Sequence, residues 1–266
     1  MKLNLIRPYF SKAGFLFLIF LCFQTPFHAE ENQREEGLYR NLTKALQNPK
    51  DVRILDLSGS KLTTLPGEIG KLRNLQILVL DNNRLIALPK EIGKLQNLQQ
   101  LHLGENQLTT LPKEIAQLQN LRILDLYQNR LTTLPEEIGQ LQNLQKLYLS
   151  NNQLTTLPKE IGQLQNLQEL DLVGNQLTTL PENIGQLQRL QTLYLGNNQL
   201  NFLPNKVEQL QNLQELGWDH NQLATLPEEI KQLKNLKKLY LHNNPLLSEK
   251  IEKIRKLLPQ CIIYFE

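Results

Sequence analysis

Two histidines and an aspartate near the carboxyl end have side chains that can bind a metal ion. Asp219 and His220 are adjacent, and His242 follows Asp219 by 23 positions. Imidazole together with carboxylate is a common ligand set for zinc. Histidines on a wet surface are more often unliganded. The alternatives are therefore a zinc site, which two molecules could also share, and an ordinary solvated surface.

Tyrosines recur in the chain at a fixed interval. Tyr148, Tyr194 and Tyr240 are separated by 46 positions each, and Tyr127 precedes the first of them by 21. Exposed tyrosines on a rigid surface give a large contact area at low entropic cost, which is typical of interface anchors. Tyrosine is also a favourable strand residue on a half-wet face. Both interpretations stay open from the sequence alone.

Charged residues of both signs occupy related positions. They are Asp125, Asp171, Lys146, Glu169, Glu215 and Lys238. Mixed charges favour specificity for a polypeptide over a uniform polyanion, although each can equally be a solvated side chain. The sequence has no phosphate-binding loop and no nucleophile elbow. We therefore predict a non-enzymatic binding protein, with no cofactor apart from the zinc considered above.

A 23-residue unit sets the spacing of all these residues. Its clearest copy runs from Leu144 to Asn166, with the sequence LQKLYLSNNQLTTLPKEIGQLQN. Copies begin at Val52, Leu75, Leu98, Leu121, Leu144, Leu167, Leu190, Leu213 and Leu236, so that eight are complete and the ninth ends near Leu246. Alternation along a short strand points positions four and six into a core. Positions two, three, five, seven and eight then face outward.

Position nine of the unit is asparagine in every copy after the first. The column consists of Asn83, Asn106, Asn129, Asn152, Asn175, Asn198, Asn221 and Asn244. An amide side chain has two donors and an acceptor, so stacked copies can satisfy the backbone groups where each strand turns away. We predict a structural ladder rather than a catalytic column. Trp218 replaces a core leucine at position six, and we interpret it as core filler.

The pattern LxxLxLxxNxLxxLPxxIxxLxN resembles the leucine-rich repeat family, from Val52 to about Leu246. The near-identity of successive copies and the lead-in LTKALQNPKDVRILDLSGSKL resemble the exported leucine-rich repeat proteins of pathogenic spirochaetes. The resemblance implies an α/β fold, a right-handed solenoid (horseshoe). It has a concave parallel β-sheet and short helical or extended turns on the convex side. We call the outward surface of the sheet, made by positions two, three, five, seven and eight, the concave face.

The two ends of the chain differ from the repeats. Residues 1–29 combine basic residues with a ten-residue apolar run, which predicts an export signal rather than a membrane anchor. Lipidation of Cys22 is the alternative. Residues 30–51 read as a polar lead and a capping helix containing Leu38 and Leu42. Residues 247–266 read as a second cap, with Ser248 at the start of a helix and a final strand in CIIYF.

The charge balance excludes some partners. The chain has 29 basic and 26 acidic residues, and removal of residues 1–29 subtracts three basic ones, which leaves 26 of each. A net charge of zero makes nucleic acid a poor candidate. No transmembrane segment is expected after removal of the signal, and we predict an exported protein that is secreted, on the outer surface, or in the periplasm.

The sequence therefore predicts that the concave face binds a protein, with a host cell-surface or matrix protein as the candidate ligand. The alternative is a self-assembling or periplasmic scaffold, a homo-oligomer that uses the apolar residues Ile54, Ile77, Val79 and Ile123 or a shared metal. A third interpretation is an inhibitor or effector that acts inside a host cell.

Overall fold

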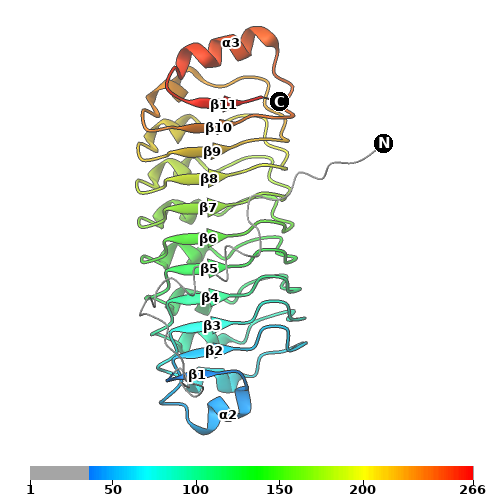
Figure 1. The fold of residues 1–266 in the computed structure, drawn as a ribbon, viewed down its shortest axis with the longest axis vertical. Coiled ribbons are helices and arrows are strands. Elements are labelled where there is room, and N and C mark those ends of the chain that lie inside the picture. The colour runs from blue at the N-terminus through cyan, green and yellow to red at the C-terminus, as the bar shows by residue number, and fades with distance from the viewer. Residues whose placement is uncertain (1–35, 266) are drawn as a thin grey trace, which may run out of the picture. The chain divides into compact units, whose positions relative to one another are not determined.

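The computed structural model describes residues 36–265, and the predicted signal at 1–29 and the lipidation alternative at Cys22 lie outside them. In the described part, eleven strands form one sheet in which each strand pairs with the next along the chain. Figure 1 shows the strands stacked in sequence order along one side, with the return segments behind them. Every pairing is parallel, as expected when each copy contributes one strand and one return path.

The strands are short and fall at the same place in each repeat. Those of the repeats occupy positions three to five. The bounds are β1 (Leu38–Tyr39), β2 (Ile54–Asp56), β3 (Ile77–Val79), β4 (Gln100–His102), β5 (Ile123–Asp125), β6 (Lys146–Tyr148), β7 (Glu169–Asp171), β8 (Thr192–Tyr194), β9 (Glu215–Gly217), β10 (Lys238–Tyr240) and β11 (Ile262–Tyr264). The register pairs like with like, for example Leu147 with Leu170, so each position of the unit forms a straight column.

Leucine columns make a continuous core behind the sheet. Leu147 at position four and Leu149 at position six are both fully buried. Burial of one such side chain stabilises the fold by about 1.5–3 kcal/mol. The leucines of neighbouring copies belong to one hydrophobic cluster. A single copy has no such cluster of its own, so stability depends on stacking.

The return path of each copy is a single 3₁₀ helix that follows the proline. The bounds are η1 (Gly67–Lys71), η2 (Lys90–Lys94), η3 (Lys113–Gln117), η4 (Glu136–Gln140), η5 (Lys159–Gln163), η6 (Glu182–Gln186), η7 (Asn205–Gln209) and η8 (Glu228–Gln232). Pro158 precedes η5 with φ −64°, a value that the ring itself imposes. Ile161 and Gly162 of η5 are buried. The predicted short helical turns are thus 3₁₀ turns.

Position eight has a left-handed backbone, which sequence reasoning did not foresee. Its φ values lie between 51° and 69° in Gly59, Asn82, Glu105, Gln128, Asn151, Gly174, Asn197, His220 and Asn243. Only glycine and, to a lesser degree, asparagine adopt this conformation without strain. Six of the nine copies have glycine or asparagine there, and the other three have Glu105, Gln128 and His220. The turn carries the chain out of the strand and toward the asparagine at position nine.

The amino end differs from the prediction in one respect. Leu38 lies in strand β1, which pairs with β2, whereas a helix had been predicted to include it. The helix α2 runs from Leu42 to Gln47. Asn41 caps it, because its side-chain oxygen accepts the backbone N–H of Lys44 at 3.0 Å. A strand at Leu38 extends the sheet by one member beyond the first repeat.

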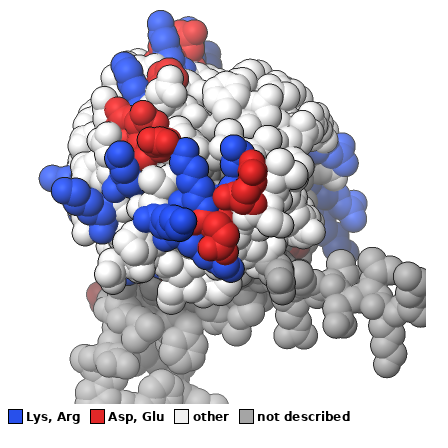
Figure 2. All heavy atoms as spheres, turned by 90° about the horizontal axis from the view of Figure 1, so that it is seen from above, with Lys and Arg blue, Asp and Glu red and all other residues white. Residues whose placement is uncertain are grey.

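The carboxyl end is closed by helix α3 (Ser248–Leu257) and strand β11. Ser248 is the first helical residue and does not cap the helix, since Leu247 occupies the cap position without a side-chain hydrogen bond. Strand β11 pairs with β10, as predicted for CIIYF. Figure 2 shows lysine, arginine and carboxylate side chains gathered over this end of the molecule. Ion pairs such as Lys253 with Glu228 contribute to that polar surface.

Candidate protein-binding face

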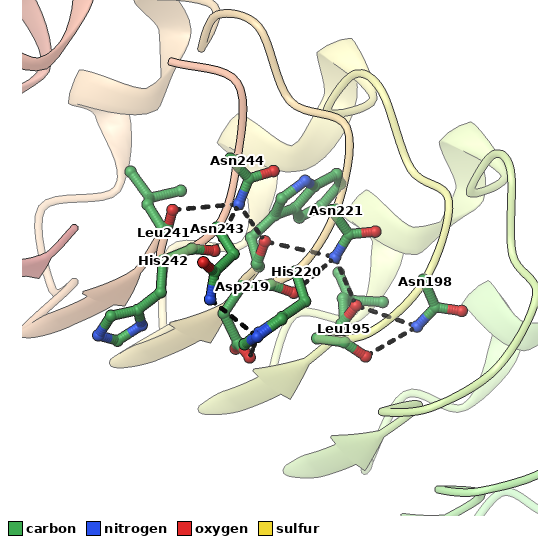
Figure 3. Close-up of polar contacts among 11 residues, drawn as sticks. Leu195, Asn198, Asp219, His220, Asn221, Leu241, His242, Asn243 and Asn244 are labelled. Carbon is green, nitrogen blue, oxygen red and sulfur yellow. Dashed lines mark hydrogen bonds and ion pairs between the residues drawn. The ribbon is translucent and has the colours of Figure 1, made fainter. Parts of the chain in front are cut away.

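The asparagines at position nine hold the strand ends in place beneath the concave face. In the fifth copy, Asn152 Oδ1 accepts the N–H of Leu131 at 3.0 Å. Its Nδ2 donates to the carbonyls of Leu126 at 2.9 Å and Leu149 at 3.0 Å. Each amide therefore links two copies. Asn198 makes the same link, and Figure 3 shows it at Asn221 and Asn244. The ladder fixes the backbone that carries positions seven and eight.

A second asparagine ladder, to which sequence reasoning assigned no role, runs along the exposed side of the stack. Asn143 Nδ2 donates to the carbonyl of Gln119, one copy earlier, at 2.8 Å. The same bond is made by Asn74, Asn97, Asn120, Asn166, Asn212 and Asn235. Arg189 takes the place of the asparagine in one copy and donates to Asn166 Oδ1 at 2.6 Å. The constant asparagine that ends the 23-residue motif was the available signal.

The concave face carries two networks of tyrosine, glutamate and lysine. Tyr148 donates its hydroxyl to Glu169 at 2.6 Å, and Lys146 pairs with the same carboxylate at 2.8 Å. Burial and the bond to Glu169 raise the pKa of Tyr148 above its ordinary value, so its hydroxyl stays protonated. The structure thus brings together three of the predicted site residues.

The second network lies nearer the carboxyl end. Tyr194 donates to Glu215 at 2.8 Å, and Lys238 pairs with Glu215 at 2.8 Å. Burial opposes ionisation of Glu215, but the bonds from Lys238 and Tyr194 outweigh it and hold the pKa of this carboxyl below its usual value. Both lysines of the predicted site are therefore balanced by glutamates on neighbouring strands.

The predicted exposure of the tyrosines is wrong for Tyr240 and only partly right for the others. Tyr240 is buried, at 7% exposure, whereas Tyr148, Tyr194 and Tyr127 are half-buried. Neighbouring strands lie about 4.8 Å apart, so a large side chain on one strand covers its neighbours. Tyr127 leans toward the preceding copy, where its hydroxyl donates to Glu105 at 3.1 Å.

Aspartates on the concave face are unusually buried. Asp125 is 6% exposed and Asp171 is 8% exposed. Desolvation raises the pKa of Asp125 to about 7, and the charges of Asp81 and Asp171 add to the shift. Burial likewise raises the pKa of Asp81 and of Asp171 to about 6. Burial of the neighbouring His102 lowers its pKa to about 4, so its ring is neutral at pH 7. Sequence reasoning placed Asp125 and Asp171 on this face but could not foresee their burial.

The structure does not bring the three candidate zinc ligands together within one chain. Between residues 36 and 265, no three histidine, cysteine, aspartate or glutamate side chains come close enough together to hold one metal ion. His220 is engaged by Asp219 Oδ2 at 3.1 Å and by Asn243 Nδ2 at 2.8 Å, and Figure 3 shows the ring of His242 lying apart from them. His242 instead stacks against Tyr240 and Tyr264, with ring centroids 6.4 and 6.1 Å away.

Tyr240 and Tyr264 form an aromatic pair at the carboxyl end of the concave face. Their ring centroids are 4.8 Å apart and the planes differ by 7°, so the rings are stacked. Tyr264 comes from the final strand, and its ring is partly exposed. Trp218 is fully buried, which agrees with its interpretation as core filler. Among residues 36–265 its indole N–H finds no hydrogen-bond partner.

These features define a repeat solenoid whose backbone is fixed by invariant leucines and asparagines and whose concave face carries variable side chains. A sequence model described as a leucine-rich repeat region matches residues 101–175 and 144–262, which together span more than half of the chain. The chain belongs to the leucine-rich repeat family, so the predicted resemblance and the horseshoe fold are confirmed. Comparison with curated proteins gave no match.

Solved structures are similar to this chain over most of its length. A leucine-rich repeat protein of Leptospira interrogans is 34% identical, with coverage of 86% of this chain and 99% of that one and a TM-score of 0.44. An internalin from Listeria monocytogenes is 23% identical, with coverage of 82% and 62% and a TM-score of 0.72. A chain from an octameric complex of latrophilin 3, Unc5D and the leucine-rich repeat part of FLRT2 is 26% identical, with coverage of 81% and 70% and a TM-score of 0.69.

The comparisons support a general class of function. The neighbour that contains the leucine-rich repeat part of FLRT2 comes from an assembly of different proteins. The family and these neighbours indicate no enzyme family. In the described residues no helix has both the length and the apolar character needed to cross a bilayer.

Proposed function

We propose that the chain is a non-enzymatic interaction module whose concave face binds a protein ligand. The observation that carries the proposal is the contrast between adjacent columns of the sheet. Position four is leucine in all nine copies. Position three, one residue earlier, holds five residue types across Ile54, Ile77, Gln100, Ile123, Lys146, Glu169, Thr192, Glu215 and Lys238. Variation is thus concentrated at a position whose side chains face outward. Changes there leave the core unaltered.

The chemistry of the variable columns suits a polypeptide. The face combines half-buried tyrosine rings with lysine and glutamate pairs, which offer both apolar area and hydrogen bonds. These side chains stand on a sheet fixed by the asparagine ladder, so little conformational entropy is lost when a partner binds. A flat, uniformly basic surface for nucleic acid would require a different composition.

We further propose that the protein is exported through residues 1–29 to the outer surface, the periplasm or the medium. The support is the basic start followed by the apolar run from Gly14 to Phe23. A host cell-surface or matrix protein is the class of ligand to test first. Mass spectrometry of the protein from its own cells tests the export proposal, because cleavage after Ala29 leaves a chain that begins at Glu30.

Binding of residues 30–266 to a panel of cell-surface and matrix proteins tests the ligand proposal. Tyr148→Ala with Tyr194→Ala should abolish binding of any saturable partner. Phe202→Ala is the matched control, since Phe202 is an aromatic residue 49% exposed outside the concave face. Circular dichroism establishes that all variants are folded. Binding that survives the double variant but is lost in the Phe202 control would overturn the assignment of this face.

Self-assembly is the second candidate, and one observation favours it. Ile262 is 58% exposed and Tyr264 is 37% exposed on β11, the last strand of the sheet. An open strand edge with apolar side chains can pair with another chain. The charged surface of α3 beside it opposes close stacking of copies through that end (Figure 2). Light scattering at increasing concentration would reveal ordered oligomers, and their presence without any ligand would favour this candidate.

A further inference from the structure

One side wall of the stack carries a ribbon of exposed, uncharged side chains. The chain runs from the sheet to the 3₁₀ helices behind it through positions ten to fifteen, which therefore form this wall. Positions twelve and thirteen are exposed in every complete copy. We call these residues the threonine ribbon, and they are Thr63, Thr64, Ile86, Ala87, Thr109, Thr110, Thr132, Thr133, Thr155, Thr156, Thr178, Thr179, Asn201, Phe202, Ala224 and Thr225. None of them is charged, so burial of the ribbon against another surface removes no ion from water.

Two large apolar side chains interrupt the threonine ribbon. Ile86 is 57% exposed and Phe202 is 49% exposed, each at a position where most copies have threonine. The other exposed large apolar side chains of residues 36–265 lie beyond the complete copies, from Leu247 onward. Leu85 and Leu203, which adjoin Ile86 and Phe202 in the chain, are buried and already belong to the core. The core therefore requires neither of the two exposed side chains.

The places of Ile86 and Phe202 in the stack are related by symmetry. Ile86 belongs to the second copy and Phe202 to the seventh, so the two lie equally far from the middle of the eight complete copies. When two threonine ribbons meet face to face about a twofold axis, the second copy of one molecule faces the seventh copy of the other. Ile86 then meets Phe202 of the partner subunit, and the same contact forms a second time about 24 Å away.

The charged column beside the threonine ribbon fits the same twofold axis. Position sixteen reads, in order, Gly67, Lys90, Lys113, Glu136, Lys159, Glu182, Asn205 and Glu228. The axis places the third copy against the sixth, so Lys113 faces Glu182 of the partner subunit. It places the fourth copy against the fifth, so Glu136 faces Lys159 of the partner subunit. Opposite charges therefore meet at four places across the axis.

The charges of position sixteen also select the register. A slip of one copy toward the amino end would place Lys113 against Lys159 of the partner subunit. A slip of one copy toward the carboxyl end would place Glu136 against Glu182 of the partner subunit. Like charges that face one another disfavour a complex. Of these three registers, only the one that joins Ile86 to Phe202 of the partner subunit has no like-charged pair in this column.

The size of the wall suits a weak dimer. Backbone hydrogen bonds join position ten of each copy to position eleven of the copy before it, as from Gln153 to Leu131 at 2.9 Å, so the copies lie close together here. Eight copies spaced about 4.8 Å apart make a ribbon roughly 34 Å long. Extended chain from position ten to position sixteen reaches roughly 20 Å. The resulting area of roughly 700 Å² is slightly below the 800 Å² or so that each partner buries in a standard interface.

We propose that two copies of the chain associate through their threonine ribbons about a twofold axis, with Ile86 against Phe202 of the partner subunit and Lys113 against Glu182 of the partner subunit. The axis runs across the wall from the sheet toward the 3₁₀ helices. It therefore turns both sheets toward the same side and leaves both concave faces open. The inference does not depend on the ligand of the concave face and does not use the open edge of β11.

Sedimentation equilibrium of residues 30–266 tests the proposal. We expect a reversible dimer with a micromolar dissociation constant, measured between about 1 and 200 μM protein. Ile86→Thr with Phe202→Thr restores the residue that most copies have at these positions, so the fold should be kept. This variant should weaken the dimer at least about tenfold. Ile262→Thr is the matched control, because Ile262 is 58% exposed on β11, and it should change the dissociation constant less than about twofold.

A charge exchange tests the twofold register. Lys113→Glu places a carboxylate against Glu182 of the partner subunit and should weaken the dimer at least about tenfold. Addition of Glu182→Lys to the same chain should return the dissociation constant to within about threefold of the original value. Positions 113 and 182 lie three copies apart within one chain, so the recovery requires contact between two molecules. Melting curves establish that every variant is folded.

Three outcomes would overturn the inference. They are a monomer at every concentration of the unaltered chain, equal weakening by the threonine double variant and by Ile262→Thr, and no recovery when Glu182→Lys is added to Lys113→Glu. A loss in Ile262→Thr alone would place the association at the edge of β11. The protein panel reads the concave face separately, so failure of the dimer leaves the proposed binding function untouched.

Discussion

Replacement of one buried ladder asparagine should destabilise the protein far more than replacement of an exposed one in the neighbouring repeat. Asn152→Ala leaves the N–H of Leu131 and the carbonyls of Leu126 and Leu149 without the partners that the amide provides. Asn152 is only 7% exposed. A buried polar group without a partner costs about 1–3 kcal/mol, so three such groups set an upper range of roughly 3–9 kcal/mol.

Water lowers that upper range. The space left by the amide is lined by polar groups, and a water molecule there can satisfy one or two of them. We therefore expect Asn152→Ala to lower the free energy of unfolding by roughly 3–5 kcal/mol. Asn143→Ala in the preceding repeat is the control, because it removes one exposed hydrogen bond, to Gln119 at 2.8 Å. Its expected cost is about 0.5–1.5 kcal/mol.

Urea unfolding followed by circular dichroism measures both variants. The slope of the transition must be compared as well as its midpoint, because a repeat protein weakened at one interface can unfold in two parts with a smaller slope. Equal losses for the two variants would refute the reasoning, since burial is the main difference between the two amides. A loss confined to Asn143→Ala would refute it more severely.

Three further predictions concern single residues. Gln128 has φ 53°, so Gln128→Gly should stay within about 0.5 kcal/mol of the unaltered chain in urea unfolding, whereas Gln128→Val should lose roughly 1–3 kcal/mol. The pKa of Asp125 is about 7 in the folded chain against an ordinary value of 3.8, so ionisation between these values favours unfolding and stability falls as pH rises. At pH 8 the free energy of unfolding of Asp125→Asn in urea should therefore exceed that of the unaltered chain by roughly 1–4 kcal/mol, and the difference should vanish below about pH 4. Trp218→Phe should cost less than about 2 kcal/mol in urea unfolding, because it removes the unpaired indole N–H and keeps a large ring, whereas Trp218→Ala should cost roughly 3–5 kcal/mol.

The columns of the core were predictable because the copies are nearly identical. Leucine at positions four and six and asparagine at position nine recur at one interval, and a stack of identical units has only one way to bury them all. The left-handed turn at position eight was not predicted, although its asparagines and glycines were a signal. Gln128 and Glu105 adopt the same φ because the surrounding hydrogen bonds impose it on any residue there.

The three candidate zinc ligands do not meet within one chain, for a reason that spacing alone cannot reveal. Asp219 and His242 occupy the same position in neighbouring copies, and such side chains do lie side by side. His220, however, belongs to the left-handed position, where its ring meets Asn243. The ring of His242 stacks against Tyr240 and Tyr264 at the end of the sheet. Tyr264 belongs to the cap and not to a repeat. The sequence predicted that positions seven and eight of neighbouring copies lie close together. It did not predict the directions in which the rings of His220 and His242 point.

The burial of Asp125 bears on why the concave face has its composition. A carboxylate whose pKa is raised to about 7 by burial lowers the stability of the fold at neutral pH. An asparagine would accept the same N–H of Tyr127 without that cost, so the structural role does not require a carboxylate. The leucine and asparagine columns already supply the core and the backbone hydrogen bonds. Asp125 therefore destabilises the fold at a position where the fold does not require a carboxylate. Such a residue is expected on a recognition surface, where some stability is given up for binding.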